Sequence, residues 1–244
     1  MPRYTSRLSG LGFGNRVTPA VRMLITICVV TFVLQLLEQL AGQSTFTFTF
    51  GLTPQKVLRG YVWQLVTYIF LHGGFFHLVF NMLGLWMFGS QLEQFWGRRE
   101  FTRFFFICGV GAAVVTVLAS PSSSIPTIGA SGAIFGILLA FGLLFPNQII
   151  LLNFIIPIPA KYYVMIFGAM TLFASISGTG GGVAHITHLG GMIIGLIYLK
   201  GRPLITNLQS RYERWQRNRL RRKFEVFYNE RHRDEEDQSP RWRN

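Results

Sequence analysis

The feature that most constrains this chain is a long stretch almost without charge. Between Arg103 and Lys200 the only charged residue is Lys161. Apolar runs of about 18 residues or more are typical of helices that cross a bilayer. Half of all residues are hydrophobic and the mean hydropathy is +0.37, which is unusual for a soluble domain. The sequence therefore predicts an all-α, polytopic membrane protein.

Six apolar runs are separated by Gly, Pro and polar residues, and we expect each run to form a spanning helix. The runs cover about residues 23–41, 74–89, 101–119, 131–145, 162–177 and 183–199. A further apolar stretch, 148–158, is too short to cross and is expected to be re-entrant or interfacial. The connection 42–71 is too apolar for an ordinary exposed loop, so we expect it to rest against the membrane interface.

The basic residues predict the orientation. If the N-terminus is cytoplasmic, only Lys56 and Arg59 of the 23 Lys and Arg residues fall in outer connections. Such a bias is typical of membrane topology, and it argues against nucleic acid as the partner of the basic residues. We expect a multi-pass protein of a bacterial inner membrane with both termini cytoplasmic. The expected regions are a tail at 1–20, a six-span domain at 21–200 and a basic tail at 201–244.

The basic tail has two readings. Its arginines and lysines can serve as a positive-inside anchor that also attracts anionic lipid, which is the interpretation we favour. A binding site for a cytosolic partner is the other interpretation.

The scarcity of carboxylates excludes several kinds of site. Before position 213 the only acidic residues are Glu38, Glu93 and Glu100, and no aspartate occurs before Asp234. An intramembrane aspartyl protease needs two membrane-embedded aspartates, and a zinc protease of the HExxH type needs that motif, which is missing. We expect no metal and no cofactor. A Ser-His-Asp triad lacks its third member, but a Ser-His pair remains possible because a nucleophile needs only an adjacent base.

Polar side chains gather near the outer ends of three spans. Spans two, four and six run from outside to inside, which puts His77, Asn81, Ser131 and His185 at similar depth. Polar groups at such depth are costly and are candidates for function. For any single histidine, a hydrogen bond to a neighbouring helix is an equal alternative. Span four, at fifteen residues from Ser131 to Phe145, is about 22 Å long, so Ser131 is expected below the outer surface, on the floor of a water-accessible cavity.

Two pairs of glycines predict close packing of spans four and six. Gly132 and Gly136 form one small-xxx-small pair, and Gly191 and Gly195 form the other. Such pairs let helix backbones approach closely. We expect this packing to bring Ser131 towards His185.

Three motifs together resemble the signature of the rhomboid family of intramembrane serine proteases. The motifs are GASG at 129–132, AHxxHxGG at 184–191 and HxxxxHxxxN at 72–81. Trp63 and the ExxxG sequence at 93–97 also look like family positions, whereas Gln64 departs from the Arg often found after that tryptophan. The resemblance covers about residues 20–200. It implies a six-helix bundle that cleaves transmembrane segments of single-span membrane proteins.

The resemblance also implies roles for individual residues. Ser131 matches the nucleophile, and His185, the first of the two histidines in span six, matches the general base. His188 matches a packing position. Asn81 and His77 match side chains that stabilise the oxyanion together with the backbone N–H of Ser131.

Two supporting residues follow from the same resemblance. Gly129 lets the chain pass close beneath the oxyanion. Phe135, one helical turn after Ser131, matches an aromatic residue that stacks on the catalytic imidazole.

Two other functions compete with proteolysis. A catalytically inactive rhomboid relative would bind membrane proteins without cutting them, but such proteins typically lack the Ser or the His. A small transporter or channel could use the histidines as a proton path, but it would need carboxylates in the spans, and these are nearly missing. The expected partners are therefore the lipid bilayer and single-span membrane proteins; the oligomeric state is not predicted.

Overall fold

The computed structural model describes residues 16–42, 45–152, 155–177, 182–201 and 215. The chain divides into two units, Met1–Gly201 and Arg202–Asn244, and the description below concerns the first. Most of the predicted N-terminal tail and nearly all of the basic C-terminal tail lie outside the described residues. The interpretations given for those tails stay predictions.

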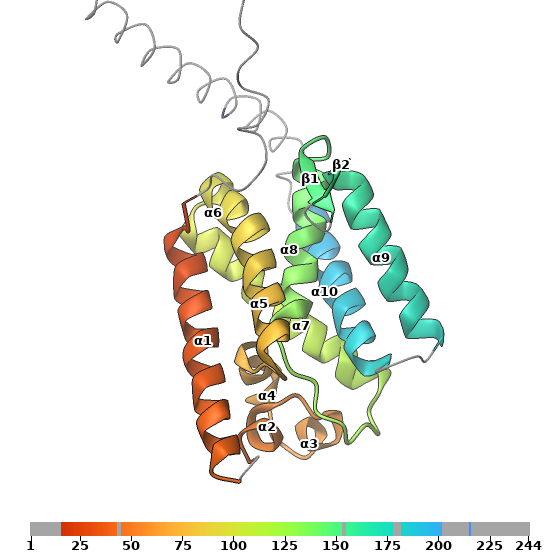
Figure 1. Cartoon of the computed structure of the whole chain (residues 1–244). Helices are drawn as coiled ribbons and strands as arrows, with labels where there is room; N and C mark the ends of the chain where they lie inside the picture. Colours follow the sequence, from red (N-terminus) through yellow and green to blue (C-terminus); the bar gives the residue numbers. More distant parts are fainter. Residues whose placement is uncertain (1–15, 43–44, 153–154, 178–181, 202–214, 216–244) are drawn as a thin grey trace, which may run out of the picture. The chain divides into compact units, whose positions relative to one another are not determined.

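The described part of the first unit is a bundle of long helices with short helices at one end (Figure 1). The long helices are α1 (Pro19–Leu40), α5 (Phe75–Gly84), α7 (Arg98–Ala119), α8 (Ser131–Leu144), α9 (Ala160–Ser177) and α10 (Gly182–Lys200). Helix α5 continues through a π-helical turn, η4 (Leu85–Gly89), into α6 (Ser90–Trp96), which ends at Gly97. Each of the six predicted spans corresponds to one of these helical segments.

The helices have the composition of a membrane protein. Helix α1, the continuous segment Phe75–Trp96, α7 and the segment Val183–Lys200 are long and apolar enough to cross a bilayer. Helices α8 and α9 are apolar but shorter, and the 14 residues of α8 give a length of about 21 Å. The prediction of an all-α, polytopic bundle is confirmed.

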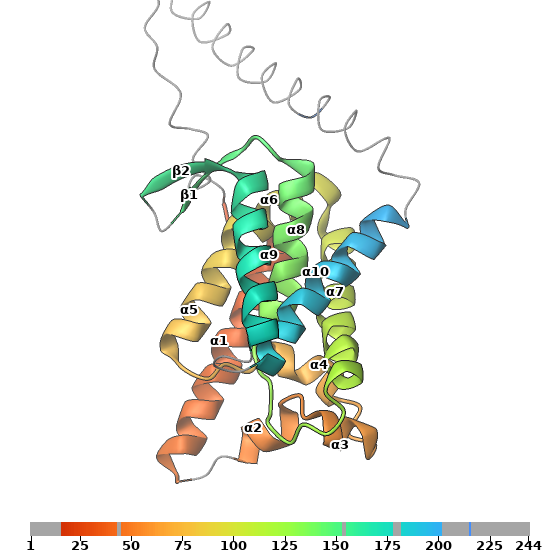
Figure 2. The same cartoon turned by 90° about the vertical axis from the view of Figure 1, so that its right-hand side faces the viewer.

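Helix α8 lies inside the bundle, packed against α7 and α10 (Figure 2). The approach to α10 is so close that a Cβ on Gly191 would lie 1.8 Å from the carbonyl oxygen of Gly132. A Cβ on Gly195 would lie 3.2 Å from Cα of Gly136. The two glycine pairs therefore meet in register along helices that run in the same direction, as the sequence predicts.

A buried carboxylate fixes the start of α1. Glu93, on α6, is 4% exposed and accepts hydrogen bonds from the backbone N–H of Ala20 (2.9 Å) and Val21 (3.0 Å) and from the hydroxyl of Thr18. The first N–H groups of a helix lack partners within the helix, and negative charge is favourable at that end. Glu93 thus ties α1 to the far end of the Phe75–Trp96 span.

The connection between α1 and α5 is built from short helices. These are α2 (Thr45–Phe50), α3 (Pro54–Leu58), α4 (Gln64–Thr67) and the 3₁₀ turn η3 (Tyr68–Phe70). Gln64 is fully buried: its Oε1 accepts from the N–H of Thr53 at 3.0 Å, and its Nε2 donates to the carbonyl of Thr49 at 3.1 Å. The indole N–H of Trp63 donates to the same carbonyl at 3.0 Å. One amide side chain therefore holds α2, α3 and α4 together.

The apolar stretch before α9 forms an antiparallel hairpin. Strand β1 (Ile149–Leu152) pairs with β2 (Ile156–Pro159), with Ile149 opposite Pro159 and Leu152 opposite Ile156. The hairpin projects beside the end of α8 and the start of α9 (Figure 2). The segment does not cross the bundle, as expected, but its strand structure was not predicted.

Candidate active site

The site is built around Ser131, the first residue of α8. Backbone hydrogen bonds fix the part of the preceding loop that is nearest to Ser131. Leu52 and Thr127 exchange backbone hydrogen bonds of 2.9 and 2.8 Å, and the N–H of Gly129 donates to the carbonyl of Tyr68 at 2.9 Å. Gly129 has φ +121°, a conformation that side-chain-bearing residues rarely adopt. The loop thereby turns sharply into α8 and leaves Ser131 at the helix start.

Ser131 is hydrogen-bonded to a histidine on α10. Nε2 of His188 lies 2.7 Å from Oγ of Ser131. The ring of Phe135, one turn further along α8, stacks on the His188 ring with centroids 4.3 Å apart and planes 7° from parallel. The hydroxyl and the aromatic ring therefore come from the same face of α8 and hold one imidazole between them.

This geometry contradicts the prediction that His185 lies against Ser131. In the described structure, His188 is the histidine that is hydrogen-bonded to Ser131. The ring of His185 lies 6.0 Å from the ring of His188, one turn back along α10. Nδ1 of His185 is buried and has no hydrogen-bond partner among the described residues. The physical reason is the register of α8 on α10: Gly132 meets Gly191, which lies one turn after His188 and almost two turns after His185. The prediction that His188 only packs is wrong for the same reason.

His77 faces the same loop from α5. Its Nδ1 accepts a hydrogen bond of 3.3 Å from the N–H of Gly73, so in the neutral ring the proton sits on Nε2. A Cβ on Gly129 would lie 2.8 Å from Nε2 of His77 and 3.8 Å from Oγ of Ser131. The missing side chain of Gly129 therefore leaves a space that both polar groups border.

Asn81 lies one turn after His77 on α5. It is 7% exposed, and its Nδ2 donates to the backbone carbonyl of His77 at 2.7 Å. That bond uses one of the two amide hydrogens and leaves the other for a ligand. The predicted pairing of the two residues on one face of a helix is present, and the structure adds this side-chain bond.

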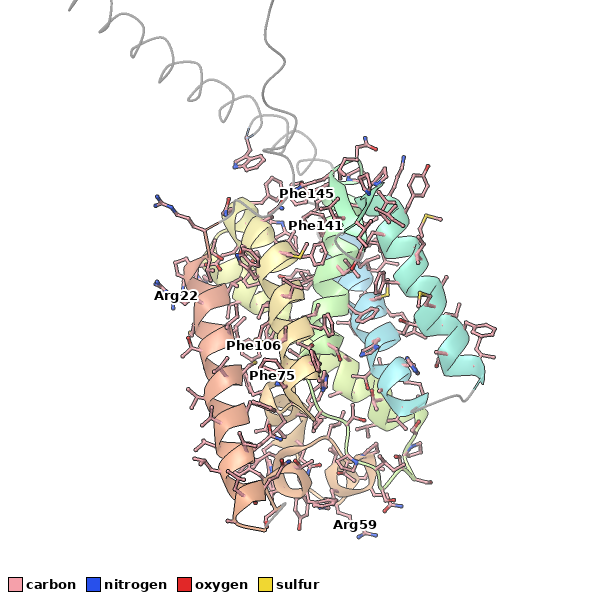
Figure 3. The ribbon with its side chains drawn as sticks, in the orientation of Figure 1. Arg22, Arg59, Phe75, Phe106, Phe141 and Phe145 are labelled. Atoms are coloured by element: carbon pink, nitrogen blue, oxygen red, sulfur yellow. The ribbon has the colours of Figure 1, made fainter. Side chains whose placement is uncertain are left out.

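The site lies inside the bundle, away from both ends. Arg22, near the start of α1, and Arg59, in the short-helix connection, mark opposite ends of the molecule (Figure 3). Phe75, the first residue of α5, lies between those levels, and α8 likewise begins well within the bundle (Figures 1 and 3). Among the described residues, no group of three His, Cys, Asp or Glu side chains is placed to hold a metal ion.

Comparison with known proteins identifies the family. The family model described as "Rhomboid domain" matches residues 59–201, which is more than half of the chain and includes Ser131, His188, His77 and Asn81. The chain belongs to the rhomboid family.

Rhomboid proteins from yeast and bacteria are among the similar proteins. "Rhomboid protein 1, mitochondrial" of Saccharomyces cerevisiae is 34% identical over 53% of this chain and 38% of its own length. "Rhomboid protease GluP" of Bacillus subtilis is 38% identical over 42% of this chain and 20% of its own. "Rhomboid protease AarA" of Providencia stuartii is 28% identical over 72% of this chain and 68% of its own. The matches thus span less than half the length of the yeast and Bacillus relatives.

Sequence reasoning passed over one polar residue of this rhomboid protein that the structure connects to the site. Gln35 lies in the apolar helix α1, is 3% exposed and accepts a hydrogen bond from the backbone N–H of His72 at 3.0 Å. The signal was present, because a buried amide in an apolar span needs polar partners. What the sequence could not supply is the identity of those partners, since they lie 12 and 37 residues away along the chain.

Proposed function

We propose that this rhomboid protein is an intramembrane serine endopeptidase in which Ser131 is the nucleophile and His188 is the general base. The observation that carries the proposal is the 2.7 Å contact between Oγ of Ser131 and Nε2 of His188. A hydroxyl within hydrogen-bonding distance of an imidazole, with the imidazole oriented by a third group, is the geometry that activates a serine. Phe135 is the orienting group here, through its stacked ring.

The proton has a complete path in this arrangement. Nε2 of His188 takes the proton of the Ser131 hydroxyl as Oγ attacks the peptide carbonyl. The imidazolium then gives that proton to the amine of the leaving segment, which breaks the C–N bond and leaves an acyl group on Oγ. In the second half, His188 takes a proton from water, the resulting hydroxide attacks the ester, and the proton returns to Oγ.

We assign three donors to the negative charge that would develop on the oxyanion. Ser131 is the first residue of α8, so its N–H has no partner within the helix. Nε2–H of His77 and the second Nδ2 hydrogen of Asn81 are the other two donors that we assign to the oxyanion. Donors held in place in a low-dielectric site contribute several kcal/mol to such a transition state, about 2.7–4 for one donor in the best-studied case.

We propose single-span membrane proteins as the substrates. A transmembrane helix hides its peptide carbonyls in backbone hydrogen bonds, so the scissile segment must unwind before Oγ can reach it. Segments with small residues at the cut site and helix-weakening residues nearby satisfy that requirement best. With both termini cytoplasmic, as the basic residues suggest, the connection before Ser131 faces outside, and the cut would fall in the outer half of the bilayer.

The two competing functions have less support. An inactive binding protein has no need of a serine hydrogen-bonded to a stacked imidazole. A proton path would need carboxylates coupled to the histidines in the spans, and the buried carboxylate of Glu93 is already bonded to the start of α1. Proteolysis, by contrast, makes use of both the hydrogen bond between Ser131 and His188 and the stacking of Phe135 on His188.

The decisive experiment is cleavage of a model single-span substrate in detergent and in liposomes. The wild-type protein should cut it and should react with a fluorophosphonate, and Ser131→Ala should do neither while keeping the wild-type unfolding temperature. Cleavage by a folded Ser131→Ala protein would show that Ser131 is not the nucleophile. Absence of both activities in the wild type would instead favour the inactive relative.

A further inference from the structure

Gln35 is a buried polar residue in the predominantly apolar helix α1. Its neighbours on α1 are Leu34 and Leu36, which are about half exposed on the outside of the bundle, whereas Gln35 is 3% exposed. Burying an amide without hydrogen bonds costs about 1–3 kcal/mol. Both ends of the Gln35 amide are used: Oε1 accepts from the N–H of His72 at 3.0 Å, and Nε2 donates to Oγ1 of Thr47 at 3.3 Å.

His72 lies next to this amide and is buried, with one hydrogen bond from its ring. It is 2% exposed, and its Nδ1 lies 3.2 Å from the carbonyl oxygen of Phe70, which can only accept, so Nδ1 carries the proton. Burial lowers the pKa of His72, which precedes the Phe75–Trp96 span, to about 4, with a smaller contribution from nearby His77. A neutral imidazole with its proton on Nδ1 is consistent with both observations. The ring packs edge-on against the ring of His77 with centroids 5.2 Å apart.

The next residue along the chain connects this anchor to the active site. Gly73 directly follows His72, and its N–H donates to Nδ1 of His77 at 3.3 Å. An imidazole that accepts at Nδ1 carries its proton at Nε2 when neutral. Nε2 is the atom of His77 that borders the space beside Gly129. The backbone at 72–73 therefore decides both the tautomer of His77 and the direction of its N–H.

We propose that Gln35 is a positioning residue for the oxyanion site. By fixing the backbone N–H of His72, it holds Gly73 in place to bond Nδ1 of His77, and Nε2–H then points to the developing negative charge. The proposal rests on the role given to His77 in the proposed function. It assigns a catalytic consequence to α1, a helix that contributes no group to the reaction itself.

A double-mutant cycle tests the proposal. Gln35→Met, which is close to Gln in length but offers only a weakly accepting thioether to the N–H of His72, should lower kcat on the model substrate with little change in KM. The loss should approach that of His77→Ala without exceeding it, and one oxyanion donor is worth about 10²–10³-fold in kcat. In a His77→Ala background, Gln35→Met should have almost no further effect on kcat. A purely structural role would instead lower kcat by the same factor in both backgrounds, which would overturn the proposal.

Two further variants keep the test interpretable. Thr47→Val removes the other partner of the amide, leaves the bond to His72 in place and should keep wild-type kcat. Gln35→Asn shortens the side chain by one methylene, so it retains the amide while withdrawing it from His72, and it decides the question if Gln35→Met fails to fold. A wild-type kcat in a folded Gln35→Asn protein would overturn the proposal.

The failure of this proposal can be told apart from failure of the proposed function. If His77→Ala keeps full activity, the oxyanion role of His77 and the positioning role of Gln35 both fall. The Ser131 and His188 assignment would still stand on the loss of cleavage in Ser131→Ala.

Discussion

The carbonyl oxygen of Gly132 and the Cα of Gly191 are in direct contact, so close that a Cβ on Gly191 would lie 1.8 Å from that oxygen. Gly132 directly follows Ser131, and Gly191 lies three residues, or nearly one turn, after His188. This contact sets the register of α8 on α10. It therefore decides which of the two histidines of α10 meets the serine.

We predict that Gly191→Ala disrupts this register. No rotamer change can relieve a clash between a Cβ and a backbone oxygen, so one of the helices must move. Overpacking of this kind typically costs 1–3 kcal/mol and occasionally more, and we expect at least about 2 kcal/mol here together with loss of cleavage. Thermal unfolding in detergent measures the first effect, and substrate cleavage the second.

Gly195→Ala is the matched control for that variant. A Cβ on Gly195 would lie 3.2 Å from Cα of Gly136, which a shift of a few tenths of an ångström relieves. The control should therefore unfold closer to the wild-type temperature and keep more activity. Equal behaviour of the two variants would mean that the Gly132 contact does not control the register.

The second prediction separates the two histidines. His188→Ala should reduce cleavage by at least about 10²-fold, because general-base catalysis contributes about 10²–10⁴ and Ser131 loses its only described hydrogen-bond partner. His185→Ala should cleave at close to the wild-type rate, since its ring lies one turn away from the contact. Fluorophosphonate labelling should follow the same order. The reverse order would restore His185 as the base.

The exchange of these histidines illustrates what the sequence could and could not predict. The motifs correctly indicated a helical bundle, a serine at the start of one span and a histidine in another. They offered two candidate histidines, His185 and His188, which lie three residues apart and so differ in position by nearly a full turn of one helix. The glycine pairs indicate which histidine lies beside Ser131, because matching Gly132 with Gly191 and Gly136 with Gly195 aligns Ser131 with His188.

The third prediction concerns the ring that stacks on His188. Phe135→Ala should lower kcat by about 2- to 10-fold, because an aromatic pair is worth about 0.5–1.5 kcal/mol and its loss lets the imidazole rotate away from Ser131. Phe135→Tyr keeps the ring and should retain most of the activity. Steady-state kinetics on the model substrate compares the two, and an unchanged kcat in Phe135→Ala would remove its orienting role.

The fourth prediction concerns Asn81. Asn81→Ala should lower kcat while leaving KM nearly unchanged, because a donor to the oxyanion acts only in the transition state. The loss should be smaller than about 10²-fold, since His77 and the N–H of Ser131 remain. If KM rises and kcat stays constant, Asn81 contacts the substrate instead of the oxyanion.

Other parts of the structure depend on contacts that no local pattern reveals. The alternating TFTFTF segment forms a short helix, α2. It belongs to the connection between α1 and α5, in which Gln64 bonds to the backbone at Thr49 and at Thr53. The stretch before α9 folds as a hairpin because two short apolar segments can pair with each other. In both cases the deciding hydrogen bonds join residues that are adjacent only after folding.

The last prediction tests the orientation on which the position of the cut depends. In an inactive Ser131→Ala background, Ser124→Cys should react with a membrane-impermeant thiol reagent added to intact cells, and Arg99→Cys should not. Both positions are exposed in the structure, so access depends on the side of the membrane. The two native cysteines, Cys28 and Cys108, are fully buried and should stay silent. The expectation follows from the basic residues, because the connection before Ser131 carries none, whereas α7 begins with Arg98 and Arg99. Permeabilising the cells should make Arg99→Cys reactive, which checks that the site itself can be labelled. Labelling of Arg99→Cys but not Ser124→Cys in intact cells would invert the orientation and move the cut to the cytoplasmic half of the bilayer, with the Ser131 and His188 chemistry unchanged.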